Sequence, residues 1–215
     1  MANLITLLRI GLLLVGVGFI YSLTVVGQVI AFFLILVVIL LDWLDGVVAR
    51  RRGQADDVGA VMDILGDRIV ENVLWIVFAD VGLVPVWVPL VIIMRGLVTD
   101  AIRSIALTHG QTAFGERTLM RSTLGRWLVV SRMSRALYAA AKLVKFGYLI
   151  LLLAGRLAHD QGWVFGPLLD NAGPMLYRIG MGLAYFTVAF CLVRGIPVML
   201  DGWHYLYRRE PSGDA

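Results

Sequence analysis

The sequence predicts an all-α integral membrane protein. Hydrophobic residues make up 60% of the chain, charged residues 16%, and the mean hydropathy is +0.84. Ordinary globular domains have roughly 45–50% apolar and about 25% charged residues. The apolar runs reach the length of about 20 residues that a helix needs to cross a bilayer, and they lack the alternating pattern of transmembrane strands. We therefore expect a helical bundle in a membrane.

Six transmembrane helices are expected along the chain. Residues that favour turns separate the apolar runs: the Gly27–Gln28 pair, the stretch GLVPVWVP (82–89) and the stretch FGPLLDNAGP (165–174). The predicted spans are 4–24, 29–49, 60–81, 86–107, 129–155 and 174–206.

The arginines predict the orientation of these spans. Cytoplasmic loops carry an excess of Lys and Arg, and one side of the predicted bundle receives Arg50–Arg52, Arg117, Arg121, Arg126, Arg208 and Arg209. The other side receives little more than Arg156 and Arg178. Both ends of the chain are thus expected in the cytoplasm, with a single six-helix domain over 1–207 and a short cytoplasmic tail over 208–215. No cleavable signal peptide is evident at the start, and we expect a multi-pass protein of the bacterial inner membrane.

The net charge of +4 is modest for so apolar a chain. It is better explained by topology and by the binding of anionic ligands than by affinity for nucleic acid. The lone Cys191 has no partner for an intrachain disulfide and is interpreted as a small apolar residue.

Four aspartates lie where the second and third predicted spans meet. Asp42 and Asp45 are three residues apart, and Asp63 and Asp67 are four apart, so each pair shares one face of a helix. The short polar connection 51–58 makes the two helices antiparallel neighbours. The four carboxylates should therefore converge at the cytoplasmic ends of these helices.

Clustered carboxylates repel one another unless cations lie between them. A set of oxygen ligands without nearby His or Cys favours a hard ion such as Mg²⁺, Mn²⁺ or Ca²⁺. Gly46, Ala49 and Gly59 leave space beside the aspartates, and Arg50 offers a group suited to phosphate. The pattern indicates a site with two metal ions for a phosphorylated substrate. The alternative is a set of salt bridges that join helices, which requires no ordered glycines.

These residues resemble the motif of the CDP-alcohol phosphotransferase family, D-x2-D-G-x2-A-R-x8-G-x3-D-x3-D. All eight specified positions are present with the family's spacing, over residues 42–67. Such a complete match is specific, and the layout of six spans is similar to the family across nearly the whole chain.

The resemblance implies roles for individual positions. Asp42, Asp45, Asp63 and Asp67 correspond to ligands of Mg²⁺ or Mn²⁺, and Asp67 also corresponds to the general base. That base would deprotonate an acceptor hydroxyl, which attacks the β-phosphate of a CDP-alcohol and releases CMP. Members of the family form homodimers, so a homodimer is expected by resemblance. The residues that correspond to the CDP-binding site are Asp42, Gly46, Ala49, Arg50 and Gly59.

A cytoplasmic site at the depth of the lipid suits one lipid reactant and one soluble reactant. We expect CDP-diacylglycerol as the donor and a small polar alcohol as the acceptor, with glycerol 3-phosphate preferred. The opening NLITLLR looks like that of phosphatidylglycerophosphate synthases, whereas Asp67–Arg68 with Glu71 is more similar to phosphatidylinositol-phosphate synthases. The residues that could bind the acceptor are Thr6, Arg9, Arg95, Arg103, Arg132, Arg135 and Lys142. For the arginines, topology and contact with lipid headgroups are the competing interpretation.

Two other classes of function compete with an enzyme. A divalent-cation transporter could use the same aspartates, but its site should lie near the middle of the membrane, and Arg50 would oppose the passage of cations. A degenerate, inactive member of the family is the other alternative, against which the complete motif argues.

Overall fold

The computed structural model of the chain describes residues 2–52, 57–108, 132–163 and 166–207. Within these stretches some residues are described by their backbone alone. They are residues 2–4, 42–52, 57–61, 63, 103, 106–108, 132–139, 166–171 and 201–207.

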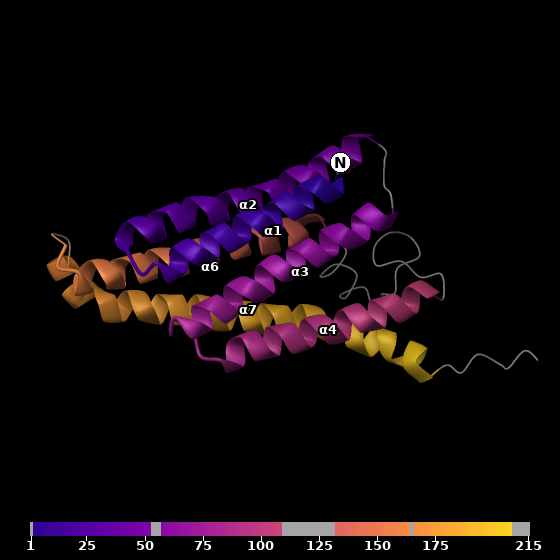
Figure 1. Cartoon of the computed structure of the whole chain (residues 1–215). Helices are drawn as coiled ribbons and strands as arrows, with labels where there is room; N and C mark the ends of the chain where they lie inside the picture. Colours follow the sequence, from indigo (N-terminus) through magenta and orange to yellow (C-terminus); the bar gives the residue numbers. More distant parts are fainter. Residues whose placement is uncertain (1, 53–56, 109–131, 164–165, 208–215) are drawn as a thin grey trace, which may run out of the picture. The chain divides into compact units, whose positions relative to one another are not determined.

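Every regular element in the described ranges is an α-helix, which confirms the predicted all-α class (Figure 1). Each helix overlaps one predicted span. The helices are α1 (Ala2–Tyr21), α2 (Val25–Arg52), α3 (Asp57–Asp80), α4 (Trp87–Thr108), α6 (Arg132–Asp160) and α7 (Gly166–Tyr207).

Two of the predicted turns are wrong. Gly27 and Gln28 belong to the first turn of α2, and α7 already begins at Gly166, so that most of the stretch 165–174 is helical. Pro167 stands in the first turn of α7, where a proline leaves no helical hydrogen bond unmade. The sequence prediction therefore took glycine and proline residues in the first turn of a helix for residues of a loop.

The connection between α1 and α2 is held by side chains. The hydroxyl of Thr24 accepts a hydrogen bond of 3.1 Å from the backbone N–H of Gly27, as an N-cap does. The side-chain amide of Gln28, which is fully buried, donates to the carbonyl of Ile20 at 2.9 Å. Because helix ends leave carbonyls without partners, these contacts fix where α1 ends and α2 begins.

Two glycines end helices in the left-handed conformation. Gly82 has φ +74° after α3, and Gly162 has φ +69° after α6. In each case the following residue donates back to a carbonyl of the last turn, Leu83 to Phe78 and Trp163 to Ala158, both at 2.9 Å. This arrangement satisfies carbonyls at the helix end. It confirms the turn predicted after residue 81.

The chain divides into two compact units. The first contains Met1–Pro89 and Lys142–Ala184, and the second contains Leu90–Ala141 and Tyr185–Ala215. In the first unit α1 packs against α2 and α3. Figure 1 shows the end of α2 and the start of α3 at the same end of this unit as the N-terminus. A single domain over 1–207 stays a prediction.

Aromatic residues form the core of the first unit between α3 and α6. The rings of Trp75 and Phe146 meet edge to face at 5.5 Å, and those of Phe78 and Phe146 stack at 5.9 Å. All three side chains are at most 1% exposed. On another side of α6, Gly147 lets Phe32 of α2 approach, with the ring 3.1 Å from where a Cβ would stand. Close packing thus binds α6 to both α2 and α3.

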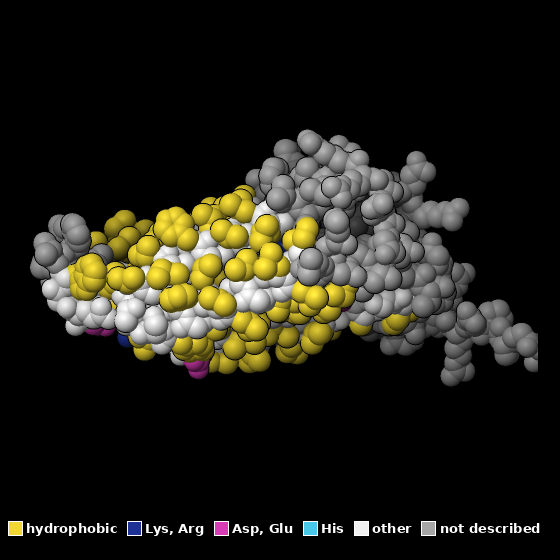
Figure 2. Space-filling model, turned by 45° about the horizontal axis from the view of Figure 1, so that its top comes forward, with side chains coloured by type: hydrophobic (Ala, Val, Ile, Leu, Met, Phe, Trp, Pro, Cys, Tyr) yellow, Lys and Arg dark blue, Asp and Glu magenta, His cyan; other side chains and the backbone are white. Residues whose placement is uncertain are grey.

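Large apolar side chains also cover the outside of the described helices. Leu7, Phe33, Leu97, Phe186 and Leu200 are each at least 58% exposed, and Figure 2 shows hydrophobic side chains spread over the visible described surface. Apolar exposure on this scale is typical of a surface that meets lipid or another protein. It is consistent with the predicted membrane protein.

One stretch of the described residues, Ala172–Leu200, is long and apolar enough by length and composition to cross a membrane. Ile5–Tyr21 and Val25–Leu41 are apolar but shorter. Six crossings therefore stay a prediction, although the described ranges contain a helix for each of them.

Candidate functional site

The predicted site begins on the two helices that carry the aspartate motif. Residues 42–50 lie in the second half of α2, and Asp63 and Asp67 lie in the first half of α3. The backbone is helical at these positions. Residues three or four apart therefore lie on the same helix face, as predicted. Of the motif, only the side chain of Asp67 lies within the described residues.

Asp67 is joined to α6 by an ion pair. The ammonium of Lys142 lies 2.6 Å from one carboxylate oxygen of Asp67 and 2.8 Å from the other. The Asp67 side chain is 40% exposed and the Lys142 side chain 10%. The structure thus brings the predicted base together with a residue predicted to bind the acceptor. The contact also holds the carboxylate in a defined position beside a positive charge.

A second layer of charge lies deeper between the same helices. Glu71, one turn after Asp67, lies 3.4 Å from the Lys142 ammonium and 3.3 Å from that of Lys145. The side chains of Glu71 and Lys145 are both 2% exposed. The Lys145 ammonium also lies 4.7 Å from the centre of the Trp75 ring, within range of a cation–π contact. The four charged groups Asp67, Lys142, Glu71 and Lys145 form what we call the α3–α6 charge network.

Sequence reasoning did not single out Lys145 and gave Glu71 no role at the site. A signal was nevertheless present. Glu71 follows Asp67 by four residues and Lys145 follows Lys142 by three, so each pair shares a helix face inside a predicted span. Ionisable residues inside membrane spans usually have partners or a function.

The first helix also reaches the neighbourhood of Asp67. A Cβ at Gly66 would lie 2.7 Å from Cγ2 of Thr6 and 3.8 Å from a terminal nitrogen of Arg9. Thr6 is 4% exposed and Arg9 is 1% exposed. Two of the predicted acceptor-binding residues therefore pack directly on α3 next to Asp67, and Gly66 is the residue that allows this approach.

Replacing Gly66 by alanine should separate α1 from α3. The added methyl group would collide with Thr6, whose β-branched side chain has little freedom to move. We expect Gly66→Ala to lower the free energy of unfolding by about 1–3 kcal/mol, measured as a lower thermal midpoint in detergent. The matched control is Gly18→Ala in α1, where a Cβ meets nothing within 4 Å. If both variants melt at the same temperature, the tight contact at Gly66 is not needed for packing.

None of the described contacts joins the remaining residues that were predicted to bind the acceptor to this site. Arg95 belongs to the second unit, where its guanidinium donates to the sulfur of Cys191 at 2.7 Å. Its stem packs on Gly195, whose Cβ would lie 2.6 Å from Cδ of Arg95. Cys191 is 1% exposed, as expected for a small buried residue. The side chains of Arg103, Arg132 and Arg135 lie outside the described residues.

The chemistry of the donor set fits a hard divalent ion. The described side chains contain no group of three or more His, Cys, Asp or Glu residues able to hold a metal, and three of the four predicted ligands lie outside them. Asp67 contributes a partly exposed carboxylate, which is a ligand that Mg²⁺ and Mn²⁺ accept. The number and kind of ions stay predictions.

The described residues form an apolar helical protein with buried charge around one carboxylate, which is consistent with a membrane protein that has a polar site between its helices. The family model for CDP-alcohol phosphatidyltransferase matches residues 1–193 of the chain. The chain therefore belongs to the CDP-alcohol phosphatidyltransferase family, a membrane-associated family of enzymes that use divalent metal ions. The resemblance inferred from the aspartate motif is thereby confirmed.

The chain is also similar to a curated protein over part of its length. The chain is 29% identical over 70 residues to the CDP-diacylglycerol–glycerol-3-phosphate 3-phosphatidyltransferase of Bacillus subtilis (strain 168). The match covers 33% of this chain and 36% of the relative. The chain thus spans about a third of the length of the curated relative that it matches.

Proposed function

We propose that the protein transfers the phosphatidyl group of CDP-diacylglycerol to a small polar alcohol and releases CMP, with glycerol 3-phosphate as the preferred acceptor. The observation that carries this proposal is the contact of Asp67 with Lys142, beside Thr6 and Arg9, in a chain of this family. A carboxylate suited to take a proton thus lies next to cations suited to hold phosphate.

In the proposed reaction Asp67 accepts the proton of the acceptor hydroxyl. The hydroxyl oxygen forms a bond to the β-phosphorus of CDP-diacylglycerol, and the bond from that phosphorus to the oxygen of CMP breaks. Lys142 and Arg9 orient the phosphate of the acceptor, because cations fix phosphate by charge-assisted hydrogen bonds. Arg50, Gly46, Ala49 and Gly59 hold the cytidine diphosphate. Asp42, Asp45, Asp63 and Asp67 would hold a divalent ion, which when bound would neutralise charge on the diphosphate.

The choice of glycerol 3-phosphate has two supports. The relative from Bacillus subtilis is named for this acceptor, and the opening NLITLLR places Thr6 and Arg9 on α1, where both contact the region of Gly66. An inositol phosphate would use the same positive charges, so the phosphatidylinositol-phosphate type is the alternative acceptor. A divalent-cation transporter is the alternative of another class.

We also infer a multi-pass homodimer whose site faces the cytoplasm. Family membership supports the membrane location, and the placement of Arg50–Arg52 at the end of α2 supports the orientation.

An acceptor screen tests the function. Purified protein in detergent is incubated with CDP-diacylglycerol and Mn²⁺ or Mg²⁺, together with glycerol 3-phosphate, inositol phosphate, inositol or serine, and the released CMP is measured. We expect the highest release with glycerol 3-phosphate and none after chelation of the metal by EDTA.

The outcomes separate the alternatives. CMP release with inositol phosphate, but with no other alcohol, would change the proposed acceptor and leave the proposed type of reaction in place. Flux of Mn²⁺ into liposomes without nucleotide, with no CMP release from any mixture, would favour a transporter and reject the enzymatic proposal.

A further inference from the structure

A cavity of about 330 Å³ opens in the first unit between the end of α3, the end of α6 and the start of α7. Four leucines, Leu83, Leu151, Leu152 and Leu176, make up most of its apolar wall. Ligand pockets in proteins commonly have volumes of about 300–1,000 Å³. The cavity is therefore large enough for part of a ligand.

This cavity lies far from the candidate catalytic site. Asp67 stands in the first half of α3, whereas Leu83 follows the last residue of that helix, Asp80. At a rise of 1.5 Å per residue, Asp67 and Asp80 are roughly 20 Å apart along the axis. The donor and acceptor proposed for the reaction bind at the other end of α3, so neither accounts for this cavity.

Exposed aromatic residues mark this end of the unit. Tyr21 ends α1, Trp87 begins α4, Trp163 follows α6 and Tyr177 lies near the start of α7, and their side chains are 45–47% exposed. Tyr and Trp are enriched where a membrane meets water, at the level of the lipid headgroups. Four such residues at this end of the unit are consistent with a cavity that opens near the headgroups of a membrane.

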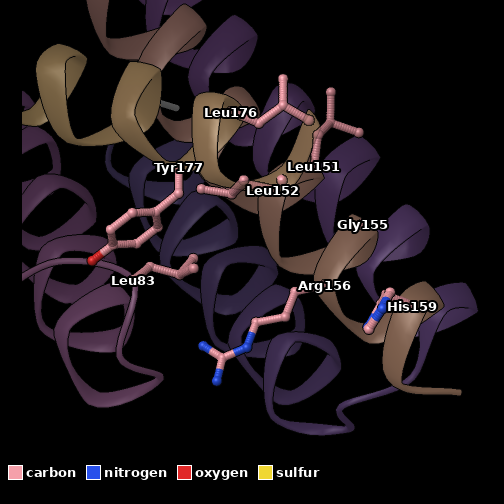
Figure 3. A pocket seen from close by; sticks show the side chains of 9 residues that line it. Leu83, Leu151, Leu152, Gly155, Arg156, His159, Leu176 and Tyr177 are labelled. Carbon is pink, nitrogen blue, oxygen red and sulfur yellow. The ribbon is translucent and has the colours of Figure 1, made fainter. Parts of the chain in front are cut away.

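One positive charge stands at the cavity. Figure 3 shows the guanidinium of Arg156 and the hydroxyl of Tyr177 extending away from Leu151 and Leu176. No carboxylate of the described residues forms an ion pair with Arg156, and Asp160, one turn further along α6, contacts His159 at 3.4 Å. A guanidinium binds phosphate through two parallel hydrogen bonds. A ligand with a phosphate and an apolar chain would satisfy both parts of this surface.

We propose that this cavity binds one anionic phospholipid, with its phosphate on Arg156 and an acyl chain along Leu83, Leu151, Leu152 and Leu176. A net negative headgroup is preferred because the guanidinium of Arg156 lines the cavity and attracts negative charge. A zwitterionic lipid offers the same phosphate but also brings its own cation, which the positive charge of Arg156 would repel. The site is distinct from the substrate site and does not depend on the proposed reaction.

Two pairs of variants test the site. Arg156→Gln removes the charge, and Arg178→Gln is its control, since Arg178 is also exposed near the start of α7 but does not line the cavity. Gly173→Leu places a bulky side chain at the wall of the cavity, where its Cβ meets nothing within 4 Å. Its control is Gly182→Leu, which is equally open on the same helix but outside the cavity.

The protein is reconstituted into vesicles of phosphatidylcholine with a minor fraction of phosphatidylglycerol and extracted in mild detergent. Lipid bound per chain and the oligomeric state are then measured by native mass spectrometry. We expect about one phosphatidylglycerol per chain in the wild type and both controls, and roughly tenfold weaker retention in Arg156→Gln. Gly173→Leu should lose retention of both lipids.

Three results would overturn the proposal. Equal retention of phosphatidylglycerol in all five proteins would show that the cavity is not its site. Retention of phosphatidylcholine equal to that of phosphatidylglycerol would reject the role of the Arg156 charge. A shift in oligomeric state in Gly173→Leu, with lipid retention unchanged, would assign the surface to a second copy of the chain.

Discussion

Replacing Asp67 by asparagine is expected to lower CMP release by about 10²–10⁴-fold, the usual contribution of a general base. The substitution keeps the size of the side chain but removes its ability to accept a proton. It also weakens the contact with Lys142, which lies 2.6 Å from the carboxylate. The initial rate of CMP release, with CDP-diacylglycerol and glycerol 3-phosphate saturating, is the measurement.

Asp80→Asn is the matched control for this prediction. Asp80 lies at the other end of α3, is exposed, and accepts a hydrogen bond of 2.8 Å from the hydroxyl of Tyr21. The same chemical change should there leave the rate within about twofold, because a surface hydrogen bond contributes little.

A second measurement separates the two roles proposed for Asp67. Binding of Mn²⁺ can be followed directly by electron paramagnetic resonance in both variants. A full rate in Asp67→Asn, with metal binding intact, would remove Asp67 from the role of base. A lost rate together with lost metal binding would leave it as a ligand alone.

The extent of the helices could be predicted well from the sequence. Each predicted span overlaps one described helix, because about 20 apolar residues between polar turns leave few alternatives in a membrane. The largest errors fall at the starts of α7 and α2 and at the end of α6. Gly27 and Pro167 stand in first turns, where glycine and proline are tolerated as well as they are in loops.

Some features of the candidate site could be predicted from the spacing of residues in the sequence, and others depend on how the helices pack. The aspartate pattern follows from positions along α2 and α3 alone, and its roles stay predictions. The contacts of Asp67 with Lys142 and of Gly66 with Thr6 join residues that are distant in sequence. Such contacts depend on the register of one helix against another, which a single sequence does not reveal. Lys142 is still a candidate from the sequence, because the cations at the start of the fifth predicted span could bind the phosphate of an acceptor.

Replacing Glu71 by glutamine is expected to destabilise the protein by about 3–5 kcal/mol, the effect of removing one partner from a buried ion pair. Glu71 and Lys145 are both 2% exposed, and their charged atoms lie 3.3 Å apart. Without the carboxylate, the Lys145 ammonium would lose the anionic partner that lies 3.3 Å from it, while its contacts with the faces of Trp75 and Phe146 would remain. A chain of this length should then melt roughly 6–20 °C lower, as measured by thermal unfolding in detergent.

A double replacement separates the effect of the Glu71 and Lys145 charges from the effect of the volume that the two side chains occupy. In Glu71→Leu with Lys145→Met, both charges are replaced by apolar groups of similar size, so the thermal midpoint should stay near that of the wild type or rise. Asp160→Asn, in the exposed pair with His159, should shift stability by less than about 1 kcal/mol. A wild-type midpoint for Glu71→Gln would contradict the argument. A double variant that melts as low as Glu71→Gln would show that the α3–α6 charge network, and not apolar packing, joins these helices.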